Sequence, residues 1–287
     1  MKLNKLYQSK KIDISIELFP PKTPDGVEKL FEKVQELKTF HPSFFSMTYG
    51  AAGSTSNLTL ELVNRLKNQE KVETMCHLTI VGQSKIQIHG ILDYLQQIGI
   101  TNIIALRGDP PKGQMHFEHH SEGYQHAIDL VRVAKKRKFS VAVAGFPEIH
   151  PDSPNRESDI RYLKEKVDAG ADVIITQLFF DNQYFFEYIG LVRKSGITVP
   201  VIPGILPILS VNQIQRFTTL SKSKIPQHVQ KELEKHRDND QAATQYGIEL
   251  ATQQCEDLMK AGVPGLHFYA LNKSYSVQTV LKNLGLA

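Results

Sequence analysis

Glu17 is the first side chain in the sequence whose type and position suggest chemistry. It lies late in the otherwise apolar run Ile12–Leu18, which is followed by a Pro-Pro pair. In a strand, alternation would place Glu17 on the same side as Asp13 and Ser15. If that side faces an enclosed site, burial would raise the pKa of Glu17 and make it a general acid near neutral pH. From position alone, a rim carboxylate paired with a neighbouring lysine or arginine is an equally good interpretation.

The sequence Arg107-Gly108-Asp109-Pro110-Pro111 is the second candidate, because it places two charges directly after an apolar run. Gly108 permits a sharp turn or the close approach of a ligand to the backbone. Pro110 disfavours helical geometry at Asp109. A charged pair on a stiff strand exit is suited to clamping a ligand. The alternative is an Arg–Asp surface pair on a tight turn.

The loop 48–54 is rich in small residues and includes Thr48, Tyr49 and Ala51. Its backbone amides and hydroxyls are suited to a flat polar ring or a phosphate. Loops of this composition are also common without ligands, so the composition alone favours neither interpretation.

His77 and Gln213 have structural interpretations that compete with functional ones. A lone histidine in an apolar run, such as His77, is more often packed and hydrogen-bonded in the core. Gln213 ends Ser210-Val211-Asn212-Gln213, a capping-box pattern, so its default role is structural. The stretch 116–120 holds three histidines and a glutamate, but no Cys or His at metal-ligand spacing accompanies it. We therefore expect no metal site there.

Eight apolar, β-branched runs alternate with stretches of helical periodicity, and most of the runs end in polar residues. A single (β/α)8 TIM barrel is the simplest fold, because alternating βα units with right-handed crossovers close into one. Such barrels hold their chemistry at the C-terminal ends of the strands. The expected strands are Ile12–Leu18, Phe44–Thr48, Thr74–Leu78, Asn102–Leu106, Ser140–Ala144, Val173–Thr176, Val201–Ile205 and Gly265–Phe268.

The expected helices begin and end at recognisable signals. Thr23 followed by Pro24 predicts a helix start, and Ser84-Lys85-Ile86-Gln87 is a capping box. Extra helices are expected before the last strand, where Ser221–Gln241 reads as an insertion with a solvated helix over Lys231–Asp238. The other helices are expected near Asn57–Asn68, Gly123–Lys136, Ser158–Ala169, Asn182–Ser195, Val211–Leu220, Ala242–Ala261 and Ser274–Leu284.

Length and composition fit one soluble barrel. The chain has 287 residues, and a barrel typically takes ~250, so we expect a single catalytic domain over residues 1–287. A net charge of +4, from 34 basic and 30 acidic residues in dispersed positions, does not suggest nucleic-acid binding. No apolar run approaches the ~20 residues that span a bilayer. Two distant cysteines favour a reducing compartment, and the polar N-terminus lacks a signal peptide, so a cytoplasmic location is expected.

Several cofactor and catalytic motifs are absent from the sequence. It contains no GxGxxG after a strand, no Walker A sequence, no HExxH and no GxSxG. A dinucleotide, if bound, would therefore lie across the barrel mouth and not in a Rossmann crevice.

Taken together, the strand ends resemble those of the methylenetetrahydrofolate reductase family, in its short bacterial form that consists of the catalytic barrel only. Any one motif is weak, but nine occur in the family's order over nearly the whole chain. They are SIELFPPKT, FFSMTYGAAGS, CHLT, ALRGDPP, VAGFPEIHP, LKEKVDAGAD, ITQLFFD, PGILP and HFYALNK.

The resemblance implies an FAD-dependent enzyme that reduces 5,10-methylenetetrahydrofolate to 5-methyltetrahydrofolate with NADH or NADPH, in support of methionine synthesis. It assigns Glu17 as the acid that protonates folate N10, and Asp109 as the carboxylate that stabilises the resulting N5 iminium cation. It implies folate contacts at Glu17, Asp109, Gln177, Gln213, Phe217 and Lys273. It implies non-covalent FAD contacts at Thr48, Tyr49, Ala51, His77, Arg107, Gly108, Asp109, Ala127, Phe146, His150, Ser153, Asp159, Tyr162 and Lys166.

Some positions depart from the family pattern. Phe146 stands where relatives have Tyr, so one hydroxyl contact to flavin is lost. Glu165 replaces a basic residue near the expected pyrophosphate, and Lys273 replaces an arginine fork with a point charge. The loop from Lys112 to Gly123 is longer than in some relatives, which makes Ala127 the least secure assignment.

The implied cycle is ping-pong: the nicotinamide reduces FAD and leaves, and folate then stacks on the same flavin face. Two alternatives stay open. One is a flavin-free or partner-dependent reductase of the same family, suggested by Phe146 and Glu165. The other is a non-catalytic folate-binding barrel, which retention of both Glu17 and Asp109 disfavours. A homo-oligomer is expected, and the sequence does not decide between NADH and NADPH.

Overall fold

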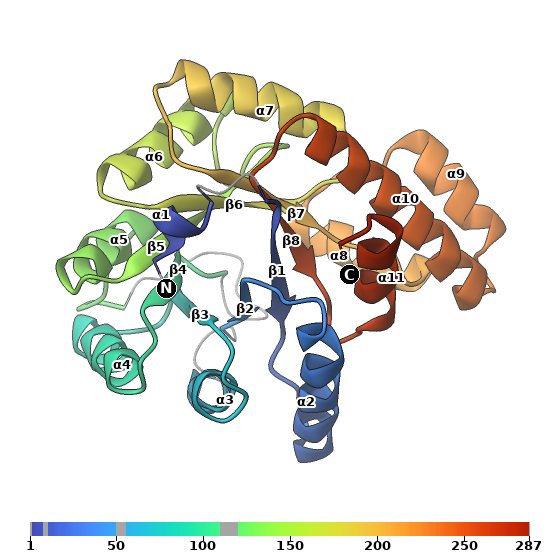
Figure 1. The fold of residues 1–287 in the computed structure, drawn as a ribbon. Helices are drawn as coiled ribbons and strands as arrows, with labels where there is room; N and C mark the ends of the chain where they lie inside the picture. Colours follow the sequence, from blue (N-terminus) through green and yellow to red (C-terminus); the bar gives the residue numbers. More distant parts are fainter. Residues whose placement is uncertain (1, 8–10, 50–55, 110–119, 287) are drawn as a thin grey trace.

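Eight parallel strands form a closed barrel in the computed structural model, which describes residues 2–7, 11–49, 56–109 and 120–286. Each strand pairs with the next along the chain, and β1 pairs with β8 to close the barrel (Figure 1). This confirms the expected (β/α)8 fold. The strands are β1 Asp13–Leu18, β2 Phe44–Met47, β3 Thr74–Thr79, β4 Asn102–Leu106, β5 Ser140–Gly145, β6 Val173–Leu178, β7 Val201–Ile205 and β8 Gly265–Tyr269.

Helices cover the outside of the barrel (Figure 1). Their starts follow the predicted signals: the Thr23 hydroxyl accepts the Gly26 amide, and Ser84 forms a capping box with Gln87. The helices are α1 Leu3–Leu6, α2 Pro24–Lys38, α3 Ser56–Asn68, α4 Lys85–Gln97, α5 Ala127–Lys136, α6 Arg156–Asp168, α7 Asn182–Lys194, α8 Val211–Ser221, α9 Gln227–Lys235, α10 Asp240–Lys260 and α11 Tyr275–Asn283.

Two helical predictions require correction. α5 begins at Ala127, after the expected Gly123, because Gly123 forms a β-bridge with Ser84 and the Asp129 carboxylate caps the later start. The extra helices before β8 are present as expected. The stretch Lys231–Asp238 is not a fully solvated helix, however: α9 spans Gln227–Lys235 and buries Val229 and Leu233.

The barrel has an apolar layer on each side of its strands. Ile14 and Ile16 of β1 pack against the helices, whereas Ser15 and Glu17 point into the barrel, as the alternation predicts. The N-terminal half of the interior is apolar, with Phe44, Met75, Ile104, Ala142, Val173, Ile175 and Ile202 beside Leu3 and Tyr7 of the α1 region. The buried polar end of β1 therefore lies above an apolar floor.

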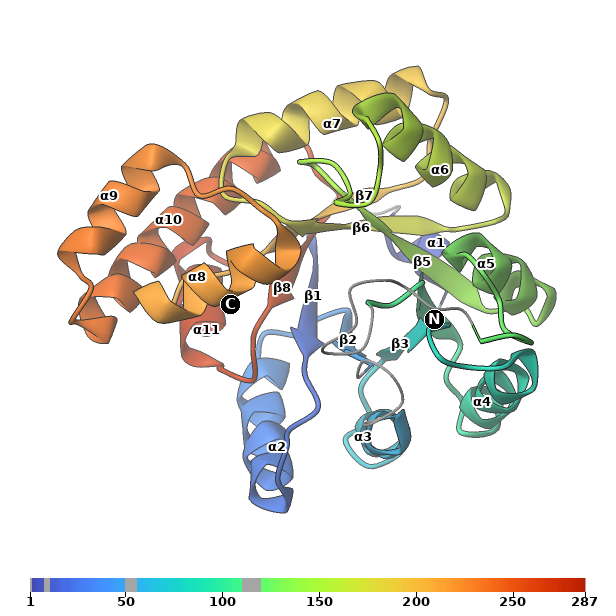
Figure 2. The same ribbon diagram turned by 180° about the vertical axis from the view of Figure 1, so that it is seen from behind.

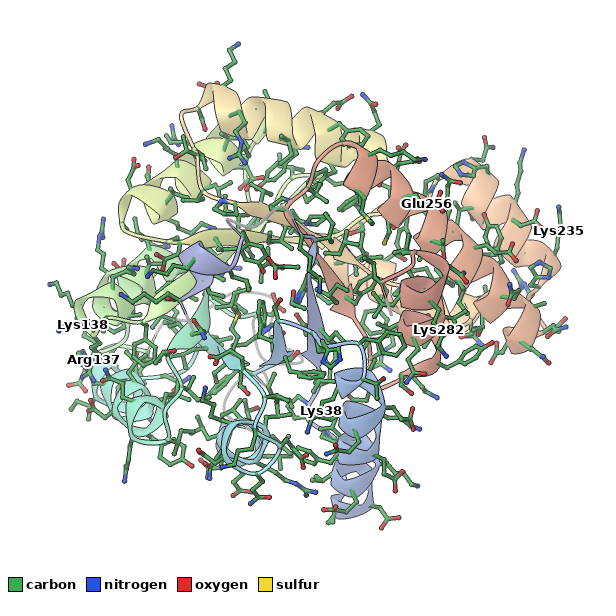
Figure 3. The ribbon with its side chains drawn as sticks, in the orientation of Figure 1. Lys38, Arg137, Lys138, Lys235, Glu256 and Lys282 are labelled. Atoms are coloured by element: carbon green, nitrogen blue, oxygen red, sulfur yellow. The ribbon has the colours of Figure 1, made fainter. Side chains whose placement is uncertain are left out.

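The outer face of the helices is charged. Lys235 on α9 and Lys282 on α11, for example, extend away from the barrel (Figure 3). Within the described ranges, no helix is long and apolar enough to cross a membrane.

Candidate active site

A cavity of about 280 Å³ opens at the C-terminal ends of the strands. Strand ends from both halves of the barrel contribute to it, and α8 covers one side; this helix is nearer the viewer in Figure 2. A larger groove of about 590 Å³ lies between α2 and α3, but no strand end contributes to it. The lining residues of the strand-end cavity are Glu17, Phe19, Thr48, His77, Ile104, Leu106, Asp109, Ala144, Phe146, Ile175, Gln177, Leu178, Phe217, Ser221 and Tyr269.

Glu17 is buried in this cavity, with 6% of its surface exposed, and its partners are two histidines and a threonine. Its Oε2 lies 3.2 Å from Nε2 of His267 and 3.4 Å from Nε2 of His77. Its Oε1 accepts the Thr48 hydroxyl at 3.1 Å. The interpretation of Glu17 as a rim carboxylate paired with a lysine or arginine is therefore wrong.

The expected direction of the Glu17 pKa shift is also wrong. Burial is the largest single influence and raises the pKa, but His77, His267 and Thr48 together outweigh it and lower the pKa below the ordinary value. Burial lowers the pKa of His77 in turn. Glu17 and His77 thus influence each other's pKa, so the titration of one depends on the charge of the other.

Ser15 and His267 complete the cluster, and neither was among the candidates from the sequence. The Ser15 Oγ lies 2.8 Å from Nδ1 of His267, on the side away from Glu17. A hydroxyl both donates and accepts, so it can pair with either tautomer of the imidazole. Alternation along HFYALNK and along β1 would have placed both side chains inside the barrel. Their distance from each other depends on the β1–β8 pairing, which aligns Ser15 with His267.

The end of β8 is tied to the end of β1. The Asn272 side chain accepts the Phe19 amide at 2.9 Å and donates to the Phe19 carbonyl at 2.8 Å. The Tyr269 hydroxyl donates to the Thr176 carbonyl at 2.7 Å, and its ring meets His267 edge-on. These contacts hold the strand ends around Glu17 in a fixed arrangement.

Gly108 turns the chain at the end of β4 and places Asp109 at the open edge of the cavity. Its φ is +92°, and a Cβ at this position would lie 2.5 Å from Cγ1 of Val81, so both the backbone and the space require glycine. Arg107 forms an ion pair with Asp152, with Nη2 and Oδ2 2.5 Å apart. The arginine is thus paired across to the next loop, and Asp109 shares the cavity with Glu17.

A second polar cluster lies between the end of β5 and α6. Asp159 accepts the His150 amide at 3.3 Å and the Ser153 hydroxyl at 3.4 Å. Lys166 donates to the Ala144 carbonyl at 3.2 Å, and burial lowers its pKa to about 8. The Phe146 ring meets His150 edge-on at 4.5 Å. The cluster offers a half-buried cation near the cavity, which suits an anionic group.

On the opposite side, α8 and β6 present two amide side chains. Gln177 Oε1 accepts the Leu178 amide at 2.9 Å, and the side chain lines the cavity. Gln213 Oε1 accepts the Leu209 amide at 2.8 Å, and Ser210 caps the Gln213 amide. Among the described residues, the buried Nε2 of Gln213 has no hydrogen-bond partner. This amide is oriented by the protein and keeps an unused donor, but Gln213 is not among the residues that line the cavity.

Comparison of the sequence with known protein families shows which family the chain belongs to. A family model for methylenetetrahydrofolate reductase matches residues 2–285. The chain belongs to the methylenetetrahydrofolate reductase family.

Members of this family resemble the chain along nearly its whole length. "5,10-methylenetetrahydrofolate reductase" of Buchnera aphidicola is 36% identical over 280 residues, covering 96% of this chain and 93% of that protein. "Methylenetetrahydrofolate reductase (NADH) 1" of Zea mays is 43% identical over 284 residues, covering 95% of this chain but 48% of the maize protein. The chain thus spans about half the length of the plant relatives it matches.

A solved structure shares the fold at low sequence identity. An uncharacterized protein from Clostridium thermocellum, described as binding two copies of 5-methyl-5,6,7,8-tetrahydrofolic acid, aligns with a TM-score of 0.67 and 12% identity. The alignment covers 99% of this chain and 97% of that protein. At this identity the likeness concerns the fold alone.

The remaining positions expected from the methylenetetrahydrofolate reductase family are spread around this site. Tyr49 is buried after β2, Ala127 begins α5, and Tyr162 on α6 is 45% exposed. Lys273 is exposed in the turn after β8, away from the cavity lining. Ala51 and most of the histidine-rich stretch 116–120 lie outside the described residues. Within the described part of the chain, no group of three or more His, Cys, Asp or Glu side chains is arranged so that it could hold a metal ion.

Proposed function

We propose that this chain reduces 5,10-methylenetetrahydrofolate to 5-methyltetrahydrofolate, using NADH or NADPH and non-covalently bound FAD. The observation that supports this most directly is the pairing of two carboxylates in one cavity. Glu17 is buried beside His267 and His77, and Asp109 lies at the open edge. Such a site could pass a proton to a ligand through Glu17 and its neighbours, and it holds a second carboxylate, Asp109, at another point.

The residues around the cavity fit a flavin dinucleotide. Lys166 and Arg107 offer positive charge for a pyrophosphate, and the absence of a side chain at Gly108 permits close approach to the backbone. His150, whose pKa is lowered by burial, offers its ring as a neutral hydrogen-bonding group. Thr48, Tyr49, Ala51, His77, Asp109, Ala127, Phe146, Ser153, Asp159 and Tyr162 are proposed as further contacts. FAD, when bound, would supply the hydride chemistry, receiving a hydride from the nicotinamide and giving one to the folate.

Glu17 would deliver a proton to folate N10, which opens the five-membered ring. Because its lowered pKa leaves the carboxylate ionised near neutral pH, Glu17 would first have to receive that proton from a neighbouring group. His267 lies between Glu17 and Ser15 and can donate or accept at Nε2, because the Ser15 hydroxyl adapts to either state at Nδ1. The histidine therefore can return a proton to Glu17 between turnovers. Asp109 would stabilise the N5 iminium cation that ring opening produces.

The amides and the ring on the other side would orient the pterin. Gln213 Nε2 is a buried donor without a partner among the described residues, so an acceptor on the pterin would satisfy it. Gln177 lies across the cavity, and Phe217 offers a flat apolar face. Lys273 is exposed and would meet the charged glutamate portion outside the cavity.

Anaerobic spectroscopy on the purified protein tests this function. A flavin absorption band that is bleached by NADH or NADPH and restored by methylenetetrahydrofolate is the expected result. Colourless, folded protein that turns over folate would favour the flavin-free alternative. Folate binding without reoxidation of a reduced flavin would favour the non-catalytic barrel.

A further inference from the structure

The turn after α8 is held by side chains and carbonyls from two other strand ends. α8 ends at Lys222, which has a left-handed φ of 59°. The Ser223 hydroxyl then donates to the carbonyl of Leu178, at the end of β6, at 2.8 Å. The backbone N–H of Lys224 lies 3.0 and 3.1 Å from the two carboxylate oxygens of Glu148, in the loop after β5.

The hydrogen bond between the Glu148 carboxylate and the Lys224 amide, which we call the anchor of α8, matters because α8 covers the cavity. Phe217 and Ser221, in its C-terminal half, line the cavity directly. The other side of α8 packs through Val211 and Ile214 against an apolar cluster. Apolar packing is less directional than hydrogen bonding, so it restrains the position of the helix along its axis less strictly. Directional hydrogen bonds at the C-terminal end can set that position.

The backbone that presents Glu148 is strained. Ile149 has a φ of +84°, which a β-branched residue rarely adopts. The Arg156 guanidinium holds the turn by donating to the carbonyls of Phe146, at 2.8 Å, and Pro147, at 2.5 Å. Strain of this kind persists where the surrounding structure imposes it, and it is common at functional sites.

Glu148 and His150, the two residues on either side of Ile149, contact different elements. Glu148 reaches the turn after α8, whereas the His150 amide donates to Asp159 on α6 at 3.3 Å. One loop thus contacts the polar cluster proposed for the flavin and the helix that covers the substrate cavity.

The surroundings of Glu148 make its charge depend on pH. Burial raises the pKa of Glu148, Lys224 and Arg156 lower it, and Asp181 raises it, with burial the largest influence. The Lys224 ammonium lies 5.6 Å from the Tyr184 ring centroid. Because the net pKa is raised, Glu148 begins to protonate at a higher pH than an exposed glutamate.

We propose that Glu148 is a positioning residue that sets α8 over the cavity and so determines the affinity for the folate substrate. This inference rests on the proposed function. Glu148 acts through the Lys224 amide and the helix before it. Its effect is therefore expected in the KM for methylenetetrahydrofolate more than in FAD binding.

The test compares E148Q and E148A with the wild-type full chain. E249Q is the matched control, because Glu249 is an exposed carboxylate on α10 that accepts a hydrogen bond from Gln245 of the same helix. Trypsin cleavage after Lys222 and Lys224, followed by mass spectrometry, reports opening of the turn without any substrate. FAD content, thermal stability and steady-state kinetics from about pH 5.5 to about pH 8 are measured on the same samples.

Loss of a charged hydrogen bond predicts about tenfold faster cleavage and an about tenfold higher folate KM in E148A, with a smaller effect in E148Q. FAD content should be unchanged, and E249Q should match the wild type. The wild-type KM should rise as the pH falls and Glu148 protonates, whereas the KM of E148Q should not follow that titration.

Unchanged cleavage in E148A would show that Glu148 does not hold the turn after α8. Faster cleavage with an unchanged KM, or loss of FAD together with the rise in KM, would overturn the positioning role. If the wild type itself does not turn over folate, the proposed function fails and the role in folate affinity fails with it, but the cleavage experiment still decides whether Glu148 anchors the turn.

Discussion

Replacing Glu17 with glutamine separates the two half-reactions of the proposed cycle. The amide keeps the volume of the side chain, and its oxygen can still accept the Thr48 hydroxyl, which lies 3.1 Å from Oε1. Its NH2 can donate to Nε2 of His267, 3.2 Å from Oε2. The side chain should therefore stay in place, but it cannot deliver a proton to N10.

The expected loss is the value of general acid catalysis, about 10²- to 10⁴-fold in the rate of folate reduction. At about 1.4 kcal/mol for each factor of ten, this raises the barrier by about 3 to 5 kcal/mol. Reduction of the flavin by NADH or NADPH needs no proton at this position and should keep its rate. Stopped-flow absorbance at the flavin band measures each half-reaction separately.

The same variant should also change how the free energy of unfolding depends on pH. The folded-state pKa of Glu17 is lowered below 4.5, so the ionised carboxylate stabilises the fold above that value and the stabilisation is lost as the pH falls through the folded pKa. E17Q should remove this part of the acid dependence in urea unfolding. Rapid folate reduction by E17Q, with FAD content intact, would refute the assignment of Glu17 as the acid.

Three other substitutions test the rest of the site. D109N should slow folate reduction on the order of 10²-fold while flavin reduction is much less affected, and equal losses in both half-reactions would mean that Asp109 only shapes the flavin site. H267N should displace the pH–rate profile of the folate half-reaction, because it removes one of the groups that lower the pKa of Glu17; a profile that overlays the wild type would contradict this. K166M should weaken FAD binding and remove its decline above about pH 8, where the wild-type lysine loses its charge, and a titration of apoprotein with FAD at several pH values measures both effects.

The local pattern of the sequence was sufficient to predict the barrel. Apolar β-branched runs, capping residues such as Thr23 and Ser84, and glycine at Gly108 act over a few neighbours, so each can be recognised without the rest of the chain. The rule that chemistry lies at the C-terminal strand ends then selected Glu17 and Asp109, and both line the same cavity.

Helix α9 marks the limit of that local reasoning. Its charged run predicts a solvated helix, but Val229 and Leu233 are buried in an apolar cluster that also contains Ile214 of α8 and Leu178, at the end of β6. The error arose because a charged sequence can still have one narrow apolar face.

The tertiary structure alone decided the electrostatics of the site. Glu17 and His267 are 250 residues apart in sequence and 3.2 Å apart in space, because β8 closes the barrel on β1. Burial by itself would raise the pKa of Glu17, and two histidines from other strands reverse the direction. Which residues become partners across the barrel depends on strand register and barrel closure, and no short stretch of sequence specifies these. The period of the apolar residues, in contrast, can be recognised within each strand by itself.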